Sequence, residues 1–332
     1  MCLKWIREQV NTLQERKMTW QPLASTENLK QRASILRSLR EFFYQRNVVE
    51  VETPLLCSTG VTDPYLDCMK VDFNHRIGYL QTSPEYAMKR LLAAGMGDCY
   101  QICKAFRCDE SGKYHNPEFT MLEWYRLDYN HHRLMDDMDE LLQLTLKCPP
   151  AQRISYQQLF LDFLNIDPHL ASIENLKNIA NEKAPSIAST LNAATDTKDD
   201  WLMLLLAELI EPKIGFDRPC FIYDYPATQS SLSKISDDVA QRFEVYVNGI
   251  ELANGFHELQ SSEEQHKRFL DDNEKRRQLN KFIMPIDQRL LTALKHGLPS
   301  CAGVALGIDR LVMLALKQTA LQEIISFDTN HA

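Results

Sequence analysis

The chain has 332 residues, of which 44% are hydrophobic and 25% are charged, and its formal net charge is −8. These proportions are typical of an ordinary globular protein, and the length suffices for one large core or two. The acidic balance argues against a large nucleic-acid interface, because such interfaces gather lysine and arginine. The apolar run at residues 202–206 is too short to cross a bilayer, so we expect no membrane segment.

The N-terminus lacks the charged and then apolar pattern of an export signal. Nine cysteines, an odd number, then favour a reduced, cytoplasmic protein with free thiols. Cys99, Cys103 and Cys108 could suggest a metal site. Their spacing is not CxxC, however, and no histidine follows at ligand distance, so we predict free thiols there as well.

The N-terminal third is predicted to alternate helices and short strands. Residues 1–18 read as an extension, which we expect to be poorly ordered. A helix begins near Leu29, capped by Ser25 or Thr26, and its apolar residues recur at helical spacing as far as Phe43. A strand over residues 48–53 follows, and Pro54 ends it.

A second helix is predicted over residues 84–94, after a short strand at 80–82. Ser83 is a good cap and Pro84 suits the first helical position, which puts Glu85 in the first turn. An acid there can bind a ligand, or it can simply complement the helix dipole.

Residues 106–125 predict two strands joined by a charged loop. Arg107 leaves the first strand, and Glu123 lies within the second. A loop that combines arginine, histidine and asparagine with an in-strand carboxylate indicates a binding site. An exposed, salt-bridged turn is the alternative.

The second half is predicted to be helical first and then mixed. Residues 150–215 read as a helical insertion. Strands follow at 221–225 and 242–252, with a hairpin turn at Asn248-Gly249. Ser262 and Gln265 form a capping box for a charged helix that reaches about Phe282, and a last helix starts at Gly307. Neither a P-loop nor a dinucleotide fingerprint is present in the sequence.

Four blocks of the sequence resemble class II aminoacyl-tRNA synthetases, in the expected order. Residues 48–54 resemble motif 1, residues 106–125 motif 2 and residues 303–314 motif 3. The run from Tyr114 to Tyr125 resembles the lysine-specific branch, and residues 251–258 resemble the lysine-pocket strand of lysyl-tRNA synthetases.

This resemblance covers roughly residues 20–328 and implies an α+β fold, an antiparallel sheet flanked by helices. It implies one catalytic domain over residues 19–330, including the helical insertion, and a homodimer formed through the first helix and strand. The barrel that binds tRNA in lysyl-tRNA synthetases is missing before motif 1, so tRNA is an unexpected partner.

The resemblance also implies an ATP site. Arginine suits phosphate because its planar fork binds two oxygens at once. By resemblance, Arg107 holds the α-phosphate and the substrate carboxylate, and Arg310 holds the γ-phosphate. Alternatively, Arg310 forms a surface ion pair with Asp309.

Glu244 and Glu251 correspond to the family's Mg²⁺ ligands, and carboxylate oxygens suit that ion. Contacts to adenine and triphosphate are implied for His115, Asn116 and Phe119, and for Asp109 or Glu110, since Asp109 replaces the family's glutamate.

The implied amino-acid pocket is acidic, although its substrate carries a carboxylate. Buried carboxylates are costly unless cations pair with them, and a diamino acid supplies two ammonium groups. By resemblance, Glu258, Glu123 and Tyr125 bind the distal ammonium and Glu85 binds the proximal amine. The remaining implied contacts are Ser83, Asn254 beside the carboxylate and Phe256 against the aliphatic chain.

One position departs from the lysyl-tRNA synthetase pattern. Ala305 stands where that family has glycine, and its methyl group reduces the space near the substrate's α and β carbons. With the missing barrel, this resembles the elongation factor P–lysine ligase family, whose members attach (R)-β-lysine to a lysine of that factor. The alternatives are neutral drift at Ala305, a truncated lysyl-tRNA synthetase acting on tRNA, and an inactive synthetase paralogue that serves as a regulatory subunit.

Overall fold

The computed structural model describes residues 20–108, 111–185 and 196–332. The predictions for the extension at 1–18, for Asp109 and for Glu110 lie outside the described residues.

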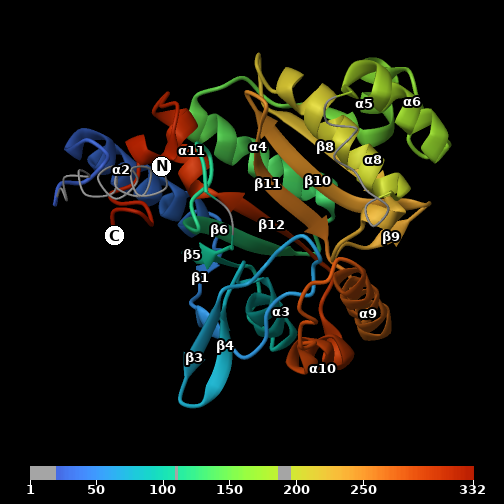
Figure 1. Cartoon of the computed structure of the whole chain (residues 1–332). Helices are drawn as coiled ribbons and strands as arrows, with labels where there is room; N and C mark the ends of the chain where they lie inside the picture. The colour runs from blue at the N-terminus through green and yellow to red at the C-terminus, as the bar shows by residue number, and fades with distance from the viewer. Residues whose placement is uncertain (1–19, 109–110, 186–195) are drawn as a thin grey trace, which may run out of the picture.

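A nine-stranded sheet forms the centre of the molecule (Figure 1). Eight strands follow one another in the order β1-β5-β6-β12-β11-β10-β8-β7, and β9 pairs with β10. All pairings are antiparallel except β1 with β5 and β7 with β8. The strands are β1 (Val49–Glu50), β5 (Cys99–Phe106), β6 (Glu118–Leu127), β7 (Gln152–Ser155), β8 (Cys220–Pro226), β9 (Ile235–Ser236), β10 (Val239–Val247), β11 (Ile250–His257) and β12 (Cys301–Gly307). The predicted α+β class with an antiparallel sheet is confirmed.

A small second sheet lies beside the main one, in the order β2-β4-β3. Its strands are β2 (Leu56–Cys57), β3 (Lys70–Phe73) and β4 (Arg76–Leu80).

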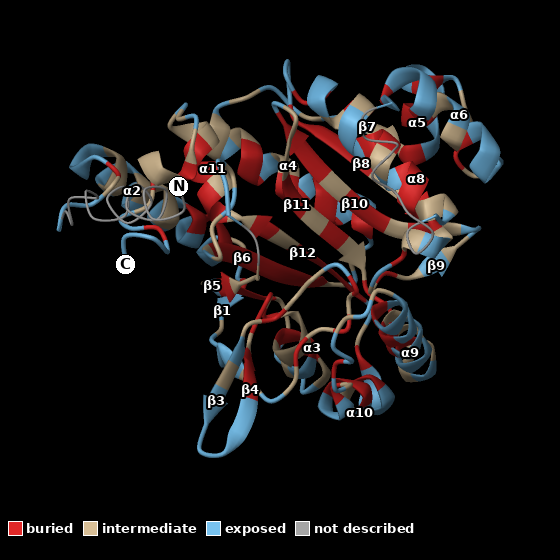
Figure 2. Ribbon diagram, in the orientation of Figure 1, coloured by how far each residue is buried: buried red, intermediate tan, exposed pale blue. Residues whose placement is uncertain are grey.

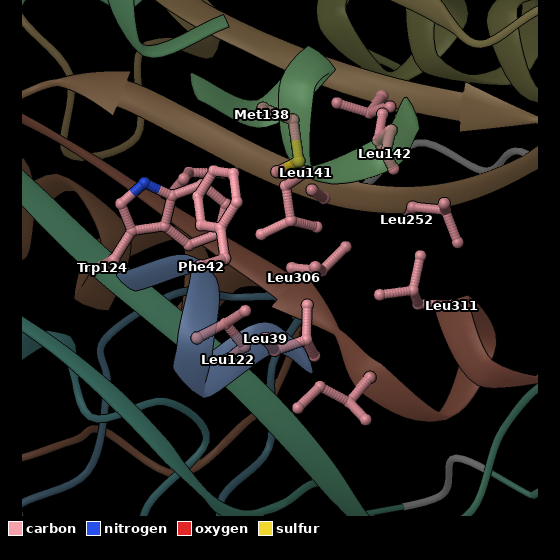
Figure 3. Packing of buried hydrophobic residues seen from close by; sticks show 14 of the residues in the cluster. Leu39, Phe42, Leu122, Trp124, Met138, Leu141, Leu142, Leu252, Leu306 and Leu311 are labelled. Atoms are coloured by element: carbon pink, nitrogen blue, oxygen red, sulfur yellow. The ribbon is translucent and has the colours of Figure 1, made fainter. Parts of the chain in front are cut away.

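Three helices cover one face of the main sheet. They are α2 (Thr26–Tyr44), α4 (His131–Leu146) and α11 (Ile308–Ala315). Side chains alternate along β6, so Leu122 and Trp124 point into this layer, where they meet Leu39 and Phe42 from α2 (Figure 3). Figure 2 shows the buried residues concentrated along the central strands and the helix faces that cover them.

Other helices flank the opposite face. Met88, Phe269 and Leu290, from α3 (Glu85–Ala93), α9 (Ser262–Gln278) and α10 (Gln288–Gly297), form a separate buried cluster with Tyr125 of β6. The segments α5 (Tyr156–Leu164), α6 (Ile173–Lys183) and α8 (Lys198–Leu205) pack together against β8 and β10. The described residues between 150 and 215 are mainly helical, but β7 adds a strand to the main sheet.

Several predicted boundaries differ from the structure. Helix α2 begins three residues early, and the Ser25 hydroxyl accepts a hydrogen bond from the Asn28 amide at 3.1 Å. Strand β1 has two residues where we predicted six. The cap of α9 is Ser261, not Ser262, and the helix ends at Gln278 rather than near Phe282. The hairpin at Asn248-Gly249 is confirmed, with both residues at positive φ.

Candidate active site

The strand register brings predicted site residues from distant parts of the sequence into two rows. In the first row, Glu123 of β6 pairs with Ala305 of β12, Ala305 with Asn254 of β11, and Asn254 with Glu244 of β10. In the second row, Tyr125 of β6 pairs with Gly303 of β12, Gly303 with Phe256 of β11, and Phe256 with Arg242 of β10. Residues two apart on a strand share a face, so both rows lie on the face opposite Leu122 and Trp124.

A cavity of about 370 Å³ opens over these rows. Its wall includes Arg107 and every residue predicted to bind the amino acid. These are Ser83, Glu85, Glu123, Tyr125, Asn254, Phe256, Glu258 and Ala305. Residues from motif 2, motif 3, helix α3 and the pocket strand therefore meet in one place, although what each binds stays a prediction.

The floor of the cavity is closed and acidic. Glu123 and Glu258 are 2% and 1% exposed, and the Tyr125 hydroxyl donates a 2.7 Å hydrogen bond to Glu123. Burial raises the pKa of the Glu123 carboxyl to about 8, and the nearby Glu85 adds to this shift. A Cβ atom on Gly303 would lie 2.3 Å from the Tyr125 ring and 2.6 Å from a Glu258 carboxylate oxygen. Glycine is therefore required where β12 passes beneath this pair.

The sequence analysis missed Lys89, which lies behind the acidic floor. Its ammonium is 2.7 Å from Glu85 Oε1 and 2.6 Å from Glu258 Oε2. The signal was present in the sequence, since Glu85 and Lys89 are four residues apart on a helix and such pairs face each other. The contact with Glu258 joins segments 169 residues apart, which no local pattern predicts.

Three buried oxygens of the cavity wall form no hydrogen bond among the described residues, namely Glu123 Oε2, Asn254 Oδ1 and Glu258 Oε2. Glu258 Oε2 lies 2.6 Å from the Lys89 ammonium, which leaves Glu123 Oε2 and Asn254 Oδ1 without a donor or a cation. Buried acceptors without a donor are costly, so their presence in a cavity indicates a ligand that brings N–H groups. An amino acid with ammonium groups has that chemistry.

Arg107 lines the cavity directly after the end of strand β5. Its backbone N–H donates to Pro117 O at 2.9 Å, which closes the base of the motif 2 loop. Its guanidinium carbon lies 5.0 Å from the centre of the Phe119 ring. The two residues are thus neighbours, and the ring predicted to stack on adenine lies against the predicted phosphate ligand.

Arg310 faces the motif 2 loop. Its guanidinium donates to Glu251 O at 2.7 Å and Tyr114 O at 3.2 Å, and Nη2 lies 2.6 Å from His115 Nε2. The alternative of a surface ion pair with Asp309 is wrong. The Asp309 carboxylate is buried and accepts from Arg32 of α2 at 2.6 Å and from the Thr120 amide at 2.8 Å.

Glu244 and Glu251 differ in their surroundings. The Glu244 carboxylate accepts from Arg242 and, at 2.7 Å each, from the hydroxyls of Tyr225 and Tyr246. Burial and the Glu244 charge raise the pKa of Glu251 to about 7. The Glu251 side chain remains 43% exposed, so water screens part of this effect.

Asn116 is held by the chain's C-terminal segment rather than by the cavity. Its carbonyl oxygen accepts from the backbone and hydroxyl of Thr329 at 3.3 Å, and its amide donates to Glu118 O at 2.6 Å. The predicted contact of Asn116 with ATP stays a prediction.

Comparison with known proteins shows the family of this chain. The family model of the class II tRNA synthetases (D, K and N) matches residues 8–331. The chain belongs to this family. An elongation factor P–(R)-β-lysine ligase of Pseudoalteromonas translucida (strain TAC 125) is 52% identical over 322 residues, covering 94% of this chain and 98% of that protein. Ligases of the same name from Vibrio atlanticus (strain LGP32) and Vibrio cholerae serotype O1 (strain ATCC 39315 / El Tor Inaba N16961) are each 51% identical, covering 93% of this chain and 98% and 97% of those proteins.

One further group of cavity residues was not predicted. Arg268, Asp272 and Lys275 of α9 line the cavity, at helical spacings of four and three residues. Arg276, the residue after Lys275, is by contrast only 2% exposed and ion-paired with Asp67. The helical spacing of Arg268, Asp272 and Lys275 along α9 was the sequence pattern that could have grouped them.

One other group could hold a metal ion among the described residues. His131, His132 and Asp224 bring three ligand atoms within 4.8 Å of one another, where α4 meets β8. His131 Nε2 already lies 2.9 Å from Asp224 Oδ1, so a hydrogen bond between helix and strand accounts for the group. In the described part of the chain, no helix has the length and apolar character to cross a membrane.

Proposed function

We propose that this chain is an ATP-dependent ligase that activates (R)-β-lysine and transfers it to a lysine ε-amine of elongation factor P. The observation that carries the proposal is an acidic cavity with two buried acceptors lacking donors, in a chain about 50% identical, along nearly its whole length, to ligases of that name. A diamino acid supplies the donors and the positive charge.

The proposed reaction has two steps. A carboxylate oxygen of the substrate attacks the α-phosphorus of ATP, the bond to the bridging oxygen breaks, and pyrophosphate leaves. The neutral ε-amine of the acceptor then attacks the acyl carbon, the bond to AMP breaks, and the amine loses a proton. Neither step needs a protein nucleophile, so catalysis depends on orientation and on stabilising negative charge.

The surroundings of Arg107 support a role in the first step. It lines the cavity that also contains the acidic residues, and its guanidinium lies near the Phe119 ring, which follows the motif 2 loop. We propose that its guanidinium holds both anions and that Arg310 binds the terminal phosphate. Arg310 is at present held by two backbone carbonyls and His115, so it is oriented before ATP arrives.

Glu244 and Glu251 are the proposed ligands of Mg²⁺. Their carboxylate oxygens are the hard ligands that this ion prefers, and burial, followed by the Glu244 charge, raises the pKa of the neighbouring Glu251. Bound there, the ion would neutralise phosphate charge. Glu244 is already held by Arg242 and two tyrosine hydroxyls, which would fix its orientation.

Ala305 is the proposed determinant of isomer choice. It lies in the register row between Glu123 and Asn254, and all three line the cavity. Its methyl group therefore occupies space between the predicted ammonium ligand and the predicted carboxylate ligand. We propose that an α-amino group fits this space less well than a β-amino group does.

We further propose a homodimer formed through α2 and β1. Tyr44 and Val49 are exposed large hydrophobic residues there, 77% and 46% exposed, which supports an interface.

A reducing, cytoplasmic setting is also proposed, because all eight cysteines among the described residues are free thiols.

The test is ATP–pyrophosphate exchange with (R)-β-lysine and α-lysine in parallel, followed by transfer assays with elongation factor P and lysine tRNA as acceptors. We expect exchange that is stronger with the β isomer, and transfer to the protein alone. Transfer to tRNA would support a truncated lysyl-tRNA synthetase, and an absence of exchange would support an inactive paralogue.

A further inference from the structure

Lys89 is a buried cation inside a pocket that is proposed to bind cations. It is 1% exposed, and its ammonium bridges Glu85, four residues earlier on α3, and Glu258, just beyond β11. A buried ammonium is costly unless carboxylates surround it, and here two do. These are two of the three carboxylates proposed to bind the substrate.

The charges of this inner group can be compared with those of the substrate. Glu85, Glu123 and Glu258 supply three negative charges when ionised, and Lys89 supplies one positive charge, which leaves a formal charge of −2. A diamino acid brings two ammonium groups, and Arg107 is the residue proposed to bind its carboxylate. Without Lys89 the three ionised carboxylates would carry one more negative charge than the substrate's two ammonium groups balance. A buried excess of negative charge is removed when a carboxylate takes up a proton.

We propose that Lys89 is a positioning residue that adjusts the charge of the pocket to a substrate with two ammonium groups, and that it holds Glu85 and Glu258 apart for them. This inference rests on the proposed function. It adds that Lys89 is the residue that makes the pocket prefer substrates with two amines. An ion pair serving only the helix would need Glu85 alone, whereas Lys89 also contacts Glu258 at 2.6 Å.

The groups that face Lys89 determine how pH acts on it. Burial opposes its charge, but Glu258 and Glu85 outweigh burial and raise the pKa of Lys89, so the ammonium stays charged. Burial raises the pKa of both Glu258 and Glu123, and Lys89 counteracts this shift. Tyr125 and Cys301 also face the group, and burial raises the pKa of each, so both stay neutral.

Removing Lys89 should therefore raise the pKa of the carboxyls further. More of them would be protonated near neutral pH, and the substrate would bind only at higher pH. A purely structural role for Lys89 predicts no such shift in the pH profile.

The experiment compares affinities for (R)-β-lysine by calorimetry from pH 6.5 to 8.5 in four variants, Lys89→Met, Glu258→Gln, the double variant and Lys177→Met. Lys177 is a half-exposed lysine of α6 that pairs with Asp196, far along the chain from the cavity, and serves as the control. Circular dichroism and thermal melting report folding, and wild-type ATP–pyrophosphate exchange runs alongside.

We expect Lys89→Met to shift the pH dependence of binding upward by about one unit. The decisive comparison is between Glu258→Gln and the double variant. The single variant has a formal charge of −1 and the double variant regains −2, so we expect the double variant to bind about tenfold more tightly. Lys177→Met should match the wild type.

Equal or weaker binding by the double variant, or an unshifted pH profile in folded Lys89→Met, would overturn the inference. If neither protein lacking Lys89 folds, Lys89 serves the fold and the inference is wrong. These results leave the proposed function intact as long as the wild type activates β-lysine, whereas a wild type that activates neither lysine contradicts the proposed function itself.

Discussion

The inner and outer ends of the cavity differ in burial and in the ligands that they can accept. The inner end, formed by Glu85, Lys89, Glu123 and Glu258, is made of strand and helix residues and is nearly closed to water. The outer end, around Arg107 and the neighbouring Arg310 and Glu251, draws these residues from the loop after β5, from α11 and from β11, and it remains partly exposed. A buried acidic site can discriminate by charge, since an uncompensated charge is costly there. An open site with arginines can admit a large, highly charged nucleotide.

The difference predicts how substitutions at the two ends should behave. Changes at the outer end should affect every substrate alike, because each one needs its carboxylate and ATP oriented. Changes at the inner end should depend on which of the substrate's amines the changed residue contacts.

The largest effect is expected from Arg107→Ala, at the border of the two ends. Losing one group that orients two anions should cost about 3 kcal/mol or more, which is a hundredfold or greater loss of ATP–pyrophosphate exchange. Lys104→Ala is the matched control, since Lys104 is an exposed cation on β5 paired with Glu118. Near-normal exchange in a folded Arg107→Ala protein would contradict the role given to the motif 2 loop.

Glu258→Gln tests the inner end. The exposed Glu263 at the start of α9 provides the control, Glu263→Gln. A charge-assisted hydrogen bond to the distal ammonium is lost, so KM for both lysine isomers should rise together, by about tenfold to a hundredfold. If only one isomer is affected, Glu258 does not bind the amine that the two share.

The sequence predicted the strand that carries Glu123 and Tyr125 from its run of aromatic and apolar residues. Along this strand Glu123 and Tyr125 alternate with Leu122 and Trp124, and the structure places the two pairs on opposite faces of the sheet. The residues missed were those whose role depends on distant partners. Lys89 needs Glu258, and Asp309 needs Arg32 and Thr120.

The outer end was less predictable for a related reason. Asn116 was assigned to ATP by resemblance, yet its side-chain oxygen accepts hydrogen bonds from Thr329, 213 residues away. Loop side chains follow no periodic pattern, so their partners depend on tertiary packing. The face of α9 that bears Arg268 and Lys275 has a helical spacing, but nothing in the sequence shows which face meets the cavity.

Ala305→Gly sharpens the comparison within the inner end. Removing the methyl group should improve exchange with α-lysine relative to β-lysine by about tenfold, because a methyl group contributes about 1–3 kcal/mol of steric discrimination. Neutral amino acids should remain poor substrates, since the carboxylates are unchanged. An unchanged isomer ratio would show that Ala305 does not determine isomer choice.

The smallest effect is a proton released on binding. Burial raises the pKa of Glu123 and Glu258 to about 8, so below that pH the empty pocket holds protons. Ammonium groups favour the ionised carboxylates, so lysine binding at pH 7 should release protons and should tighten as pH rises toward 8. Calorimetry in two buffers with different ionisation enthalpies measures this release. Proton uptake, or no exchange of protons, would mean that the carboxylates are already ionised in the empty pocket.

The central claim is that the acidic cavity activates a diamino acid for transfer to a protein. The most direct measurement is the intact mass of elongation factor P after incubation with this enzyme, ATP and (R)-β-lysine. We predict a mass gain of one lysyl group on a single lysine, and no gain with the Arg107→Ala variant. An unchanged mass of elongation factor P, with a wild-type enzyme that catalyses ATP–pyrophosphate exchange, would contradict the account.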